Sequence, residues 1–135
     1  MNKARLLAFA QLLRLPNVFT AFADVCMAGA ATGAITTNTG PWLLVLAASG
    51  CLYLSGMVWN DVFDRAEDAR DRPFRPIPSG RVRVRTAVIL AVVLMAAGLL
   101  AASVAEGTTV GVMFGPRLVA VLLAGAVLLY DGFLK

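Results

Sequence analysis

Three aspartates that follow a long apolar segment are the residues of this sequence best suited to chemistry. Asp61, Asp64 and Asp68 stand at positions i, i+3 and i+7, which places them along one helix face with Asn60 at its edge. Like charges this close repel one another, and a divalent cation removes the conflict. Mg²⁺ prefers hard oxygen ligands and takes one or two carboxylates, with water and phosphate oxygens completing its shell. The spacing therefore predicts a magnesium site that receives a phosphorylated substrate.

Arginines follow the acidic segment and supply the opposite charge. Arg72 and Arg75 lie in the same loop, and guanidinium groups donate paired hydrogen bonds to phosphate oxygens. Three prolines and a Ser-Gly pair between residues 73 and 80 stiffen this loop. Carboxylates that can bind a metal ion, followed by arginines that can bind an anion, together predict a diphosphate site. The alternative is a solvated helix end in which Glu67 and its neighbouring arginines form surface salt bridges.

A second polar feature lies inside the first apolar segment. Asn17, Thr20 and Asp24 share one helix face through the same i, i+3, i+7 spacing. An acidic side chain inside a membrane-spanning helix is unfavourable by a few kcal/mol unless it faces a polar interior. We therefore expect Asn17 and Asp24 to line the cavity that the three aspartates also reach. The alternative is a structural role, in which Asp24 pairs with an arginine or a backbone group of a neighbouring helix.

The elements that must position these residues are membrane-spanning helices. Hydrophobic residues make up 59% of the chain and charged residues 15%, against roughly 45–50% and about 25% in soluble domains. Four apolar blocks approach the roughly 20 residues that a spanning helix needs, and the third has no polar face. The sequence predicts an all-α integral membrane protein of about four transmembrane helices in a single domain, residues 1–135. The expected bounds are 2–14 for a surface helix ended by Pro16, 17–36, 41–60, 86–105 and 113–133 for the spans, and 60–85 for a long motif-bearing loop.

The basic residues are distributed as a topology signal. Three precede the first predicted span and seven lie between the second and third, whereas the opposite side carries only Arg117. By the positive-inside rule, both termini and the 60–85 loop face the cytoplasm, and the protein lies in the cytoplasmic membrane among its lipids. The net charge of +4 does not indicate nucleic acid, because the basic residues alternate with acids and lack an aromatic platform. A zinc site is excluded because the sequence has no histidine and only two separated cysteines.

The acidic and arginine-rich segment resembles the first aspartate-rich motif of the UbiA-type intramembrane prenyltransferases. Arg14-Leu15-Pro16-Asn17 is similar to the N-terminal signature of that family, and residues 130–135 are similar to the close of its fourth helix. The resemblance covers essentially the whole chain. The residues that carry the main motif are Asn60, Asp61, Asp64, Asp68, Arg72 and the run Arg75-Pro76-Ile77-Pro78-Ser79-Gly80-Arg81.

The resemblance implies a bundle of about nine helices, of which this chain corresponds to the first half. In that family two aspartate-rich motifs hold Mg²⁺, which binds the diphosphate of an isoprenyl donor. Loss of the diphosphate leaves an allylic cation that a lipophilic acceptor, such as an aromatic compound, captures. The site residues that the resemblance implies are Asn60, Asp61, Asp64 and Asp68 for metal and diphosphate, Arg72 and Arg75 for the diphosphate, and Asn17 for the cavity wall.

The sequence departs from the family in one respect, because nothing in residues 86–135 resembles the second aspartate-rich motif. We therefore expect a fragment of a longer enzyme, a subunit that works with another membrane chain, or a degenerate member, and no catalysis by this chain alone. The leading interpretation is Mg²⁺-dependent transfer of an isoprenyl group to a lipophilic acceptor. Two alternatives stay open: a non-catalytic protein of the same fold that binds a prenyl or phosphorylated lipid, and a small transporter or assembly subunit that uses Asp24 as an ion site.

Overall fold

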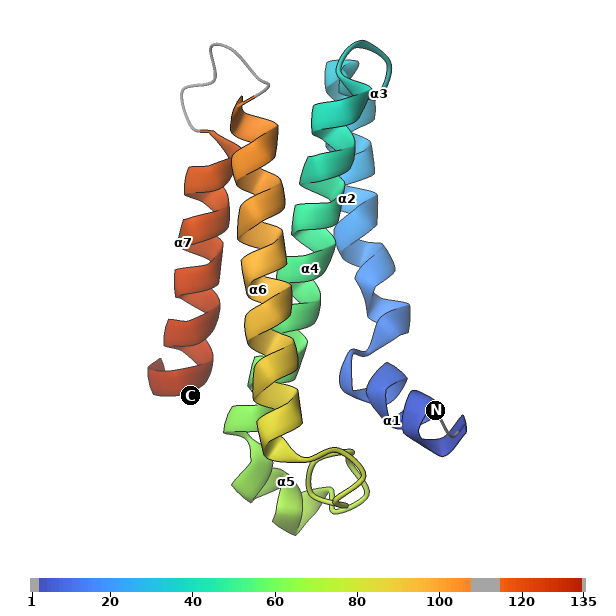
Figure 1. Cartoon of the computed structure of the whole chain (residues 1–135), viewed down its shortest axis with the longest axis vertical. Coiled ribbons are helices and arrows are strands. Elements are labelled where there is room, and N and C mark those ends of the chain that lie inside the picture. The colour runs from blue at the N-terminus through green and yellow to red at the C-terminus, as the bar shows by residue number, and fades with distance from the viewer. Residues whose placement is uncertain (1–2, 108–114, 135) are drawn as a thin grey trace.

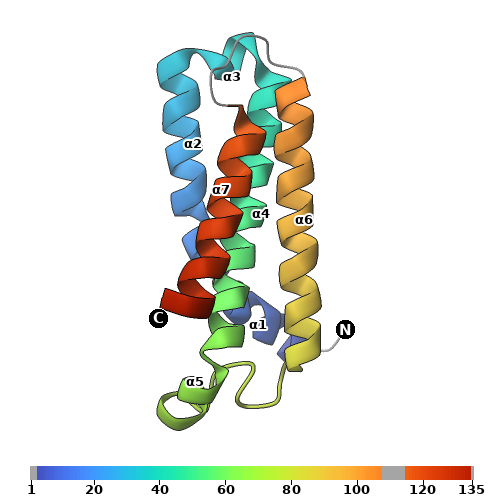
Figure 2. The same cartoon turned by 90° about the vertical axis from the view of Figure 1, so that its left-hand side faces the viewer.

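A computed structural model describes residues 3–107 and 115–134, and these residues form a helical bundle. The helices α4 and α6 lie side by side through the centre, with α2 against α4 (Figure 1). Helix α7 packs on both α4 and α6 (Figure 2). The bounds are α1 Lys3–Leu12, α2 Val18–Thr32, α3 Ala34–Thr37, α4 Thr39–Phe63, α5 Arg65–Asp71, α6 Val84–Gly107 and α7 Pro116–Leu129, with a 3₁₀ turn η1 Leu15–Asn17 and a π-helical end η2 Tyr130–Leu134.

The predicted all-helical membrane class is confirmed. Within the described ranges, α4 and α6 are long and apolar enough to cross a membrane, with 25 and 24 residues. A third span results if α1 and the segment Leu15–Thr32, bent by 45° relative to each other, count as one. Helix α7 has only 14 residues, because Gly115 is extended and Pro116 begins the helix. The fourth span at 113–133 therefore remains a prediction, and its first two residues lie outside the described part of the chain.

The bend between α1 and α2 brings α1 against the bundle. Helix α1 ends at Leu12, two residues before the expected end, and Arg14 adopts a left-handed conformation with φ 46°. A helix cannot continue from α1 through Pro16, because proline lacks the amide N–H that would bond to the Leu12 carbonyl, and the chain turns at Arg14 instead. Ala8 and Leu12 of α1 are fully buried in a core cluster that α4 and the loop before α6 also form. As a result, α1, α5 and the end of α7 lie at one end of the bundle (Figure 1).

Small residues let α4 and α6 approach closely. The Ser55 hydroxyl, fully buried, donates a 2.8 Å hydrogen bond to the Ala91 carbonyl across the two helices. A Cβ atom placed on Gly98 would lie 2.8 Å from Leu52 Cγ and 3.2 Å from the Ala48 carbonyl oxygen. Contacts of this kind stabilise helix pairs in membranes, where the bilayer supplies no hydrophobic force between helices.

Replacing Gly98 with valine is expected to destabilise the bundle. Overpacking a close helix contact costs about 1–3 kcal/mol, because Leu52 and the α4 backbone must move to admit the new side chain. Gly125→Val in α7 is the matched control, since a Cβ there meets no atom within 4 Å. Thermal unfolding in detergent measures both variants. Equal loss of stability in the two would contradict the packing described for α4 and α6.

Candidate functional site

The acidic segment, whose aspartates were expected along one helix face, is divided between two helices. Helix α4 ends at Phe63, Asp64 forms a turn, and α5 begins at Arg65. Helical hydrogen bonds still cross the break, from the Asp64 amide to the Asn60 carbonyl at 2.9 Å and from the Asp68 amide to the Asp64 carbonyl at 2.8 Å. Residues 61–68 contain neither glycine nor proline, so no helix-breaking residue indicates this turn.

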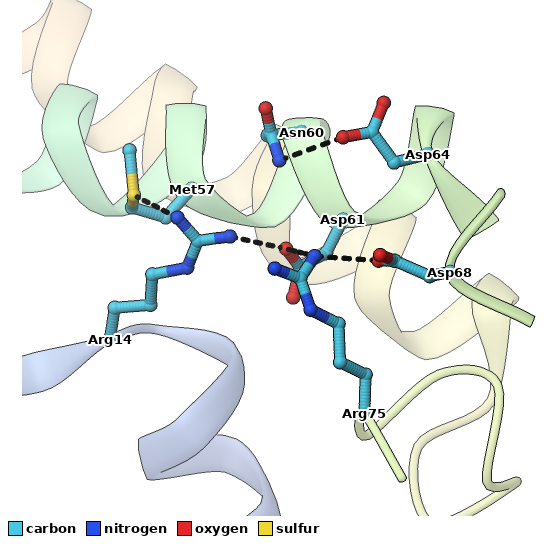
Figure 3. Close-up of polar contacts among 7 residues, drawn as sticks. All are labelled: Arg14, Met57, Asn60, Asp61, Asp64, Asp68 and Arg75. Carbon is cyan, nitrogen blue, oxygen red and sulfur yellow. Dashed lines mark hydrogen bonds and ion pairs between the residues drawn. The ribbon is translucent and has the colours of Figure 1, made fainter. Parts of the chain in front are cut away.

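Two of the three aspartates converge on one cation. Asp61 and Asp68 are each only 4% exposed. The same Nη1 atom of Arg75 lies 2.6 Å from Asp68 Oδ2 and 3.3 Å from Asp61 Oδ1 (Figure 3). Residues seven apart on a helix differ by only about 20° in direction, and the helical hydrogen bonds across the break at Asp64 keep both carboxylates on this common face. Their burial and shared partner separate them from an ordinary solvated helix end.

Asp64 lies on the neighbouring face rather than in line with the other two aspartates. Asn60 Nδ2 donates a 3.1 Å hydrogen bond to Asp64 Oδ2, and the pair points away from Arg75 (Figure 3). A residue three positions from Asp61 is turned by about 60°, and Asn60 and Asp64 share an i, i+4 relation. The three aspartates are therefore divided between two faces. Asp61 and Asp68 converge on Arg75, and Asp64 pairs with Asn60 on the adjacent face.

Arg14 is a site residue that the sequence interpretation missed. Its Nη2 atom lies 2.9 Å from Asp61 Oδ1, and its Nη1 donates to the Met57 sulfur at 3.7 Å (Figure 3). Left-handed backbone geometry at a residue other than glycine costs roughly 1–2 kcal/mol, so the surrounding contacts hold Arg14 in place. From the sequence, Arg14 was named only as a topology charge and as part of the N-terminal stretch that resembles the family, without a role at the site.

Arg14 and Arg75 contact Asp61, and Arg81 lines the same hollow, which has a volume of about 240 Å³. Arg81 forms one wall, where its guanidinium donates to Gln11 Oε1 at 2.8 Å and to the Phe74 carbonyl. A lining with three guanidinium groups and one carboxylate leaves the hollow positively charged, which suits an anion. We name it the Asp61 hollow, and its lining residues are Gln11, Arg14, Asp61, Phe74, Arg75, Pro76 and Arg81.

The other predicted residues lie at varying distance from this hollow. Arg72 is exposed after the end of α5 and does not line it, and neither does Asn17, which is exposed in η1. Asp24 and Thr20 instead line a mostly apolar pocket of about 320 Å³ between α2, α4 and α7. Met57 belongs to that pocket and also contacts Arg14. The pocket and the Asp61 hollow are therefore neighbours with Met57 between them.

The donor set around Asp61 fits a magnesium ion. Arg75 places a positive charge between two buried carboxylates, so this position already accepts a cation. Within residues 3–107 and 115–134, no three or more Asp, Glu, His or Cys side chains gather closely enough to hold a metal alone. Mg²⁺ does not require such a group, since one or two carboxylates and substrate phosphate oxygens suffice. Asp61 and Asp68 are the protein ligands that this geometry offers.

Comparison with known proteins gives a consistent family assignment. The family model described as UbiA prenyltransferase family matches residues 17–135. Similar curated proteins are digeranylgeranylglyceryl phosphate synthases. The relative from Methanothrix thermoacetophila is 42% identical over an alignment of 87 residues that covers 59% of this chain and 33% of the relative. The relative from Ignicoccus hospitalis is 31% identical over 126 residues, 93% of this chain and 38% of the relative.

A third relative, from Saccharolobus solfataricus, is 34% identical over an alignment of 101 residues that covers 68% of this chain and 33% of the relative. The chain thus spans about a third of the length of the curated relatives that it matches. No solved structure matches this chain.

Proposed function

This chain belongs to the UbiA prenyltransferase family, and from that premise we propose that it takes part in transferring an isoprenyl group from an isoprenyl diphosphate to a lipophilic acceptor in the membrane. The observation that supports this most strongly is the convergence of the buried Asp61 and Asp68 carboxylates on one cation at the end of α4. Arginines beside a cation site at the end of a membrane-spanning helix suit a diphosphate whose hydrocarbon chain lies in the bilayer. By the charge distribution, this end of the bundle faces the cytoplasm.

In the proposed reaction, the residues of the Asp61 hollow bind and orient the diphosphate. Asp61 and Asp68 would hold Mg²⁺, which when bound neutralises negative charge and stabilises the departing diphosphate. Arg14 and Arg75 donate hydrogen bonds to the diphosphate oxygens, where charge develops as the bond to the isoprenyl carbon breaks. The neighbouring apolar pocket of about 320 Å³ shelters the isoprenyl chain and keeps water from the allylic cation.

The proposed acceptor is a glyceryl phosphate lipid in place of the aromatic compound expected from the sequence. The names of the relatives describe synthesis of digeranylgeranylglyceryl phosphate. Such a product carries two geranylgeranyl groups on one glyceryl phosphate. The acceptor that fits it is therefore a glyceryl phosphate with one isoprenyl group already attached, and the donor is geranylgeranyl diphosphate.

Removal of Mg²⁺ tests the proposal directly. In lipid nanodiscs, we expect the protein to bind labelled geranylgeranyl diphosphate with Mg²⁺, and roughly 100-fold more weakly with EDTA, because a metal ion supplies several kcal/mol of charge stabilisation. Restoring Mg²⁺ should restore binding. Equal affinity with and without the metal would contradict the proposed role of Asp61 and Asp68.

The transporter alternative is favoured by one observation, the position of Asp24 on the wall of the apolar pocket. We expect Asp24→Asn to weaken diphosphate binding less than Asp64→Ala, because Met57 separates Asp24 from the Asp61 hollow, whereas Asp64 lies with Asn60 on the helix face adjacent to Asp61. The same nanodisc binding assay compares the two variants. The reverse order would favour an ion site at Asp24.

A further inference from the structure

A second basic hollow lies beside the Asp61 hollow. It has a volume of about 240 Å³ and is lined by three arginines, from α1 and from the segment that leads into α6. No carboxylate lines it, which distinguishes it from the Asp61 hollow and from the acidic surface of α5. We name it the Arg5 hollow, and its lining residues are Arg5, Phe9, Gly80, Arg81, Val82, Arg83 and Thr86.

The two sides of the Arg5 hollow are held in fixed positions. Ala8 and Leu12 anchor α1 in the core cluster, and Val82 and Ala87 anchor the start of α6 in the same cluster. The Val82 amide also donates to the Pro76 carbonyl at 2.9 Å. The packing of α1 and α6 therefore brings Arg5 and Arg83 to one hollow although they are far apart in sequence.

The guanidinium groups of this hollow differ in their availability. Arg81 already donates to Gln11, Ser79 and the Phe74 carbonyl, so it acts as a wall. Arg5 and Arg83 form no ion pair with any residue that the structure describes. Thr86 adds a hydroxyl in the first turn of α6, at the positive end of a long helix. Arg5, Arg83 and the N-terminal turn of α6 together can bind a small, doubly charged oxyanion.

Arg81 lines both hollows, so the two anion sites share one wall. The proposed reaction brings together two phosphorylated molecules, a diphosphate donor and a glyceryl phosphate acceptor. A second phosphate in the Asp61 hollow would add negative charge beside the diphosphate, and separate positive hollows avoid that repulsion. Phe9 gives the Arg5 hollow an apolar wall suited to the hydrocarbon of a lipid.

We propose that the Arg5 hollow binds the phosphate monoester of the lipid acceptor, with Arg5 and Arg83 as the principal donors. This inference rests on the proposed function, because the acceptor is identified there. The same chemistry could be supplied by the headgroup of a bulk anionic phospholipid, so the experiment must separate the two sources. Arg5 and Arg83 are specificity residues for the acceptor, and the diphosphate is bound without them.

The test uses the protein in nanodiscs of neutral lipid and a 1-O-alkyl glyceryl phosphate as the probe. In the double variant Arg5→Gln, Arg83→Gln, we expect about tenfold weaker binding of the probe or more, because charge-assisted hydrogen bonds to phosphate are lost. Binding of geranylgeranyl diphosphate with Mg²⁺ should change less than about twofold, since the Asp61 hollow keeps its arginines. The matched control, Arg70→Gln with Arg85→Gln, removes the same charge from residues that do not line the hollow.

The outcomes separate this inference from the proposed function. Probe binding that survives in the double variant, or falls equally in the control, would overturn the site. Competition by phosphatidylglycerol as strong as that of unlabelled probe would overturn the acceptor assignment. If the wild type binds the probe through Arg5 and Arg83 but fails to bind the diphosphate, the proposed function fails while the phosphate site stands. A 1-O-alkyl glycerol without phosphate should not compete, and competition by it would overturn the role of the phosphate.

Discussion

Replacing both Asp61 and Asp64 with alanine is expected to abolish the Mg²⁺-dependent binding of isoprenyl diphosphate. Asp61 is one of two buried carboxylates that converge on a cation, and Asp64 lies on the adjacent helix face with Asn60. Without Asp61, one charged oxygen ligand is lost and Arg14 loses its carboxylate partner. We expect the metal-dependent affinity to fall by about 100-fold or more. Titration of labelled diphosphate in nanodiscs, with Mg²⁺ and with EDTA, measures the change.

Stability must be measured with this variant, because removing one partner of a buried ion pair costs about 3–5 kcal/mol. The isosteric pair Asp61→Asn, Asp64→Asn keeps the shape of the side chains and should lose metal-dependent binding while the helices stay assembled. Glu67→Ala with Asp71→Ala is the charge-matched control, since both residues are exposed on α5. Unchanged binding in the aspartate variants, or an equal loss in the control, would count against the assignment.

The central helices could be predicted from the sequence because hydropathy alone determines their length. The predicted spans 41–60 and 86–105 lie within α4, Thr39–Phe63, and α6, Val84–Gly107. Helix α2 ends at Thr32, before the end of the first predicted span, 17–36, because Gly33 adopts φ 71°. A glycine inside an apolar run is compatible with a continuous helix, so only the three-dimensional structure reveals this left-handed turn.

The site could be predicted only as far as local spacing determines it. The seven-residue separation of Asp61 and Asp68 was enough to place both on one face, and the structure brings them together. The salt bridge from Arg14 to Asp61 joins residues 47 positions apart, so it depends on how α1 docks against α4. The position of Arg75 between the two carboxylates likewise follows from the path of the loop, because no local periodicity determines it.

Arg75 contacts both Asp61 and Asp68, so in the proposed function the arginine and Mg²⁺ would compete for the same carboxylate oxygens. A single Nη1 atom contacts both carboxylates, and only 19% of the Arg75 side chain is exposed. For the metal to bind, the guanidinium must leave at least one carboxylate. The diphosphate offers it a new anionic partner in the same hollow. In the proposed function, Arg75 thus exchanges an acidic partner for a phosphate when donor and metal arrive together.

This exchange predicts that the Arg75→Gln substitution changes the affinities for Mg²⁺ and for diphosphate in opposite directions. Binding of Mg²⁺ alone should tighten by about tenfold, because two buried carboxylates are left with less compensating charge and the competing cation is gone. Binding of the diphosphate in saturating Mg²⁺ should weaken by about tenfold or more, because a charged donor to the phosphate is lost. Calorimetric titration with Mg²⁺ and with diphosphate measures the two affinities separately.

Arg72→Gln removes the same charge from an exposed position outside the hollow, and it should leave the Mg²⁺ affinity nearly unchanged. A Mg²⁺ affinity that falls in Arg75→Gln would mean that the arginine supports the metal site and does not compete with the ion for it.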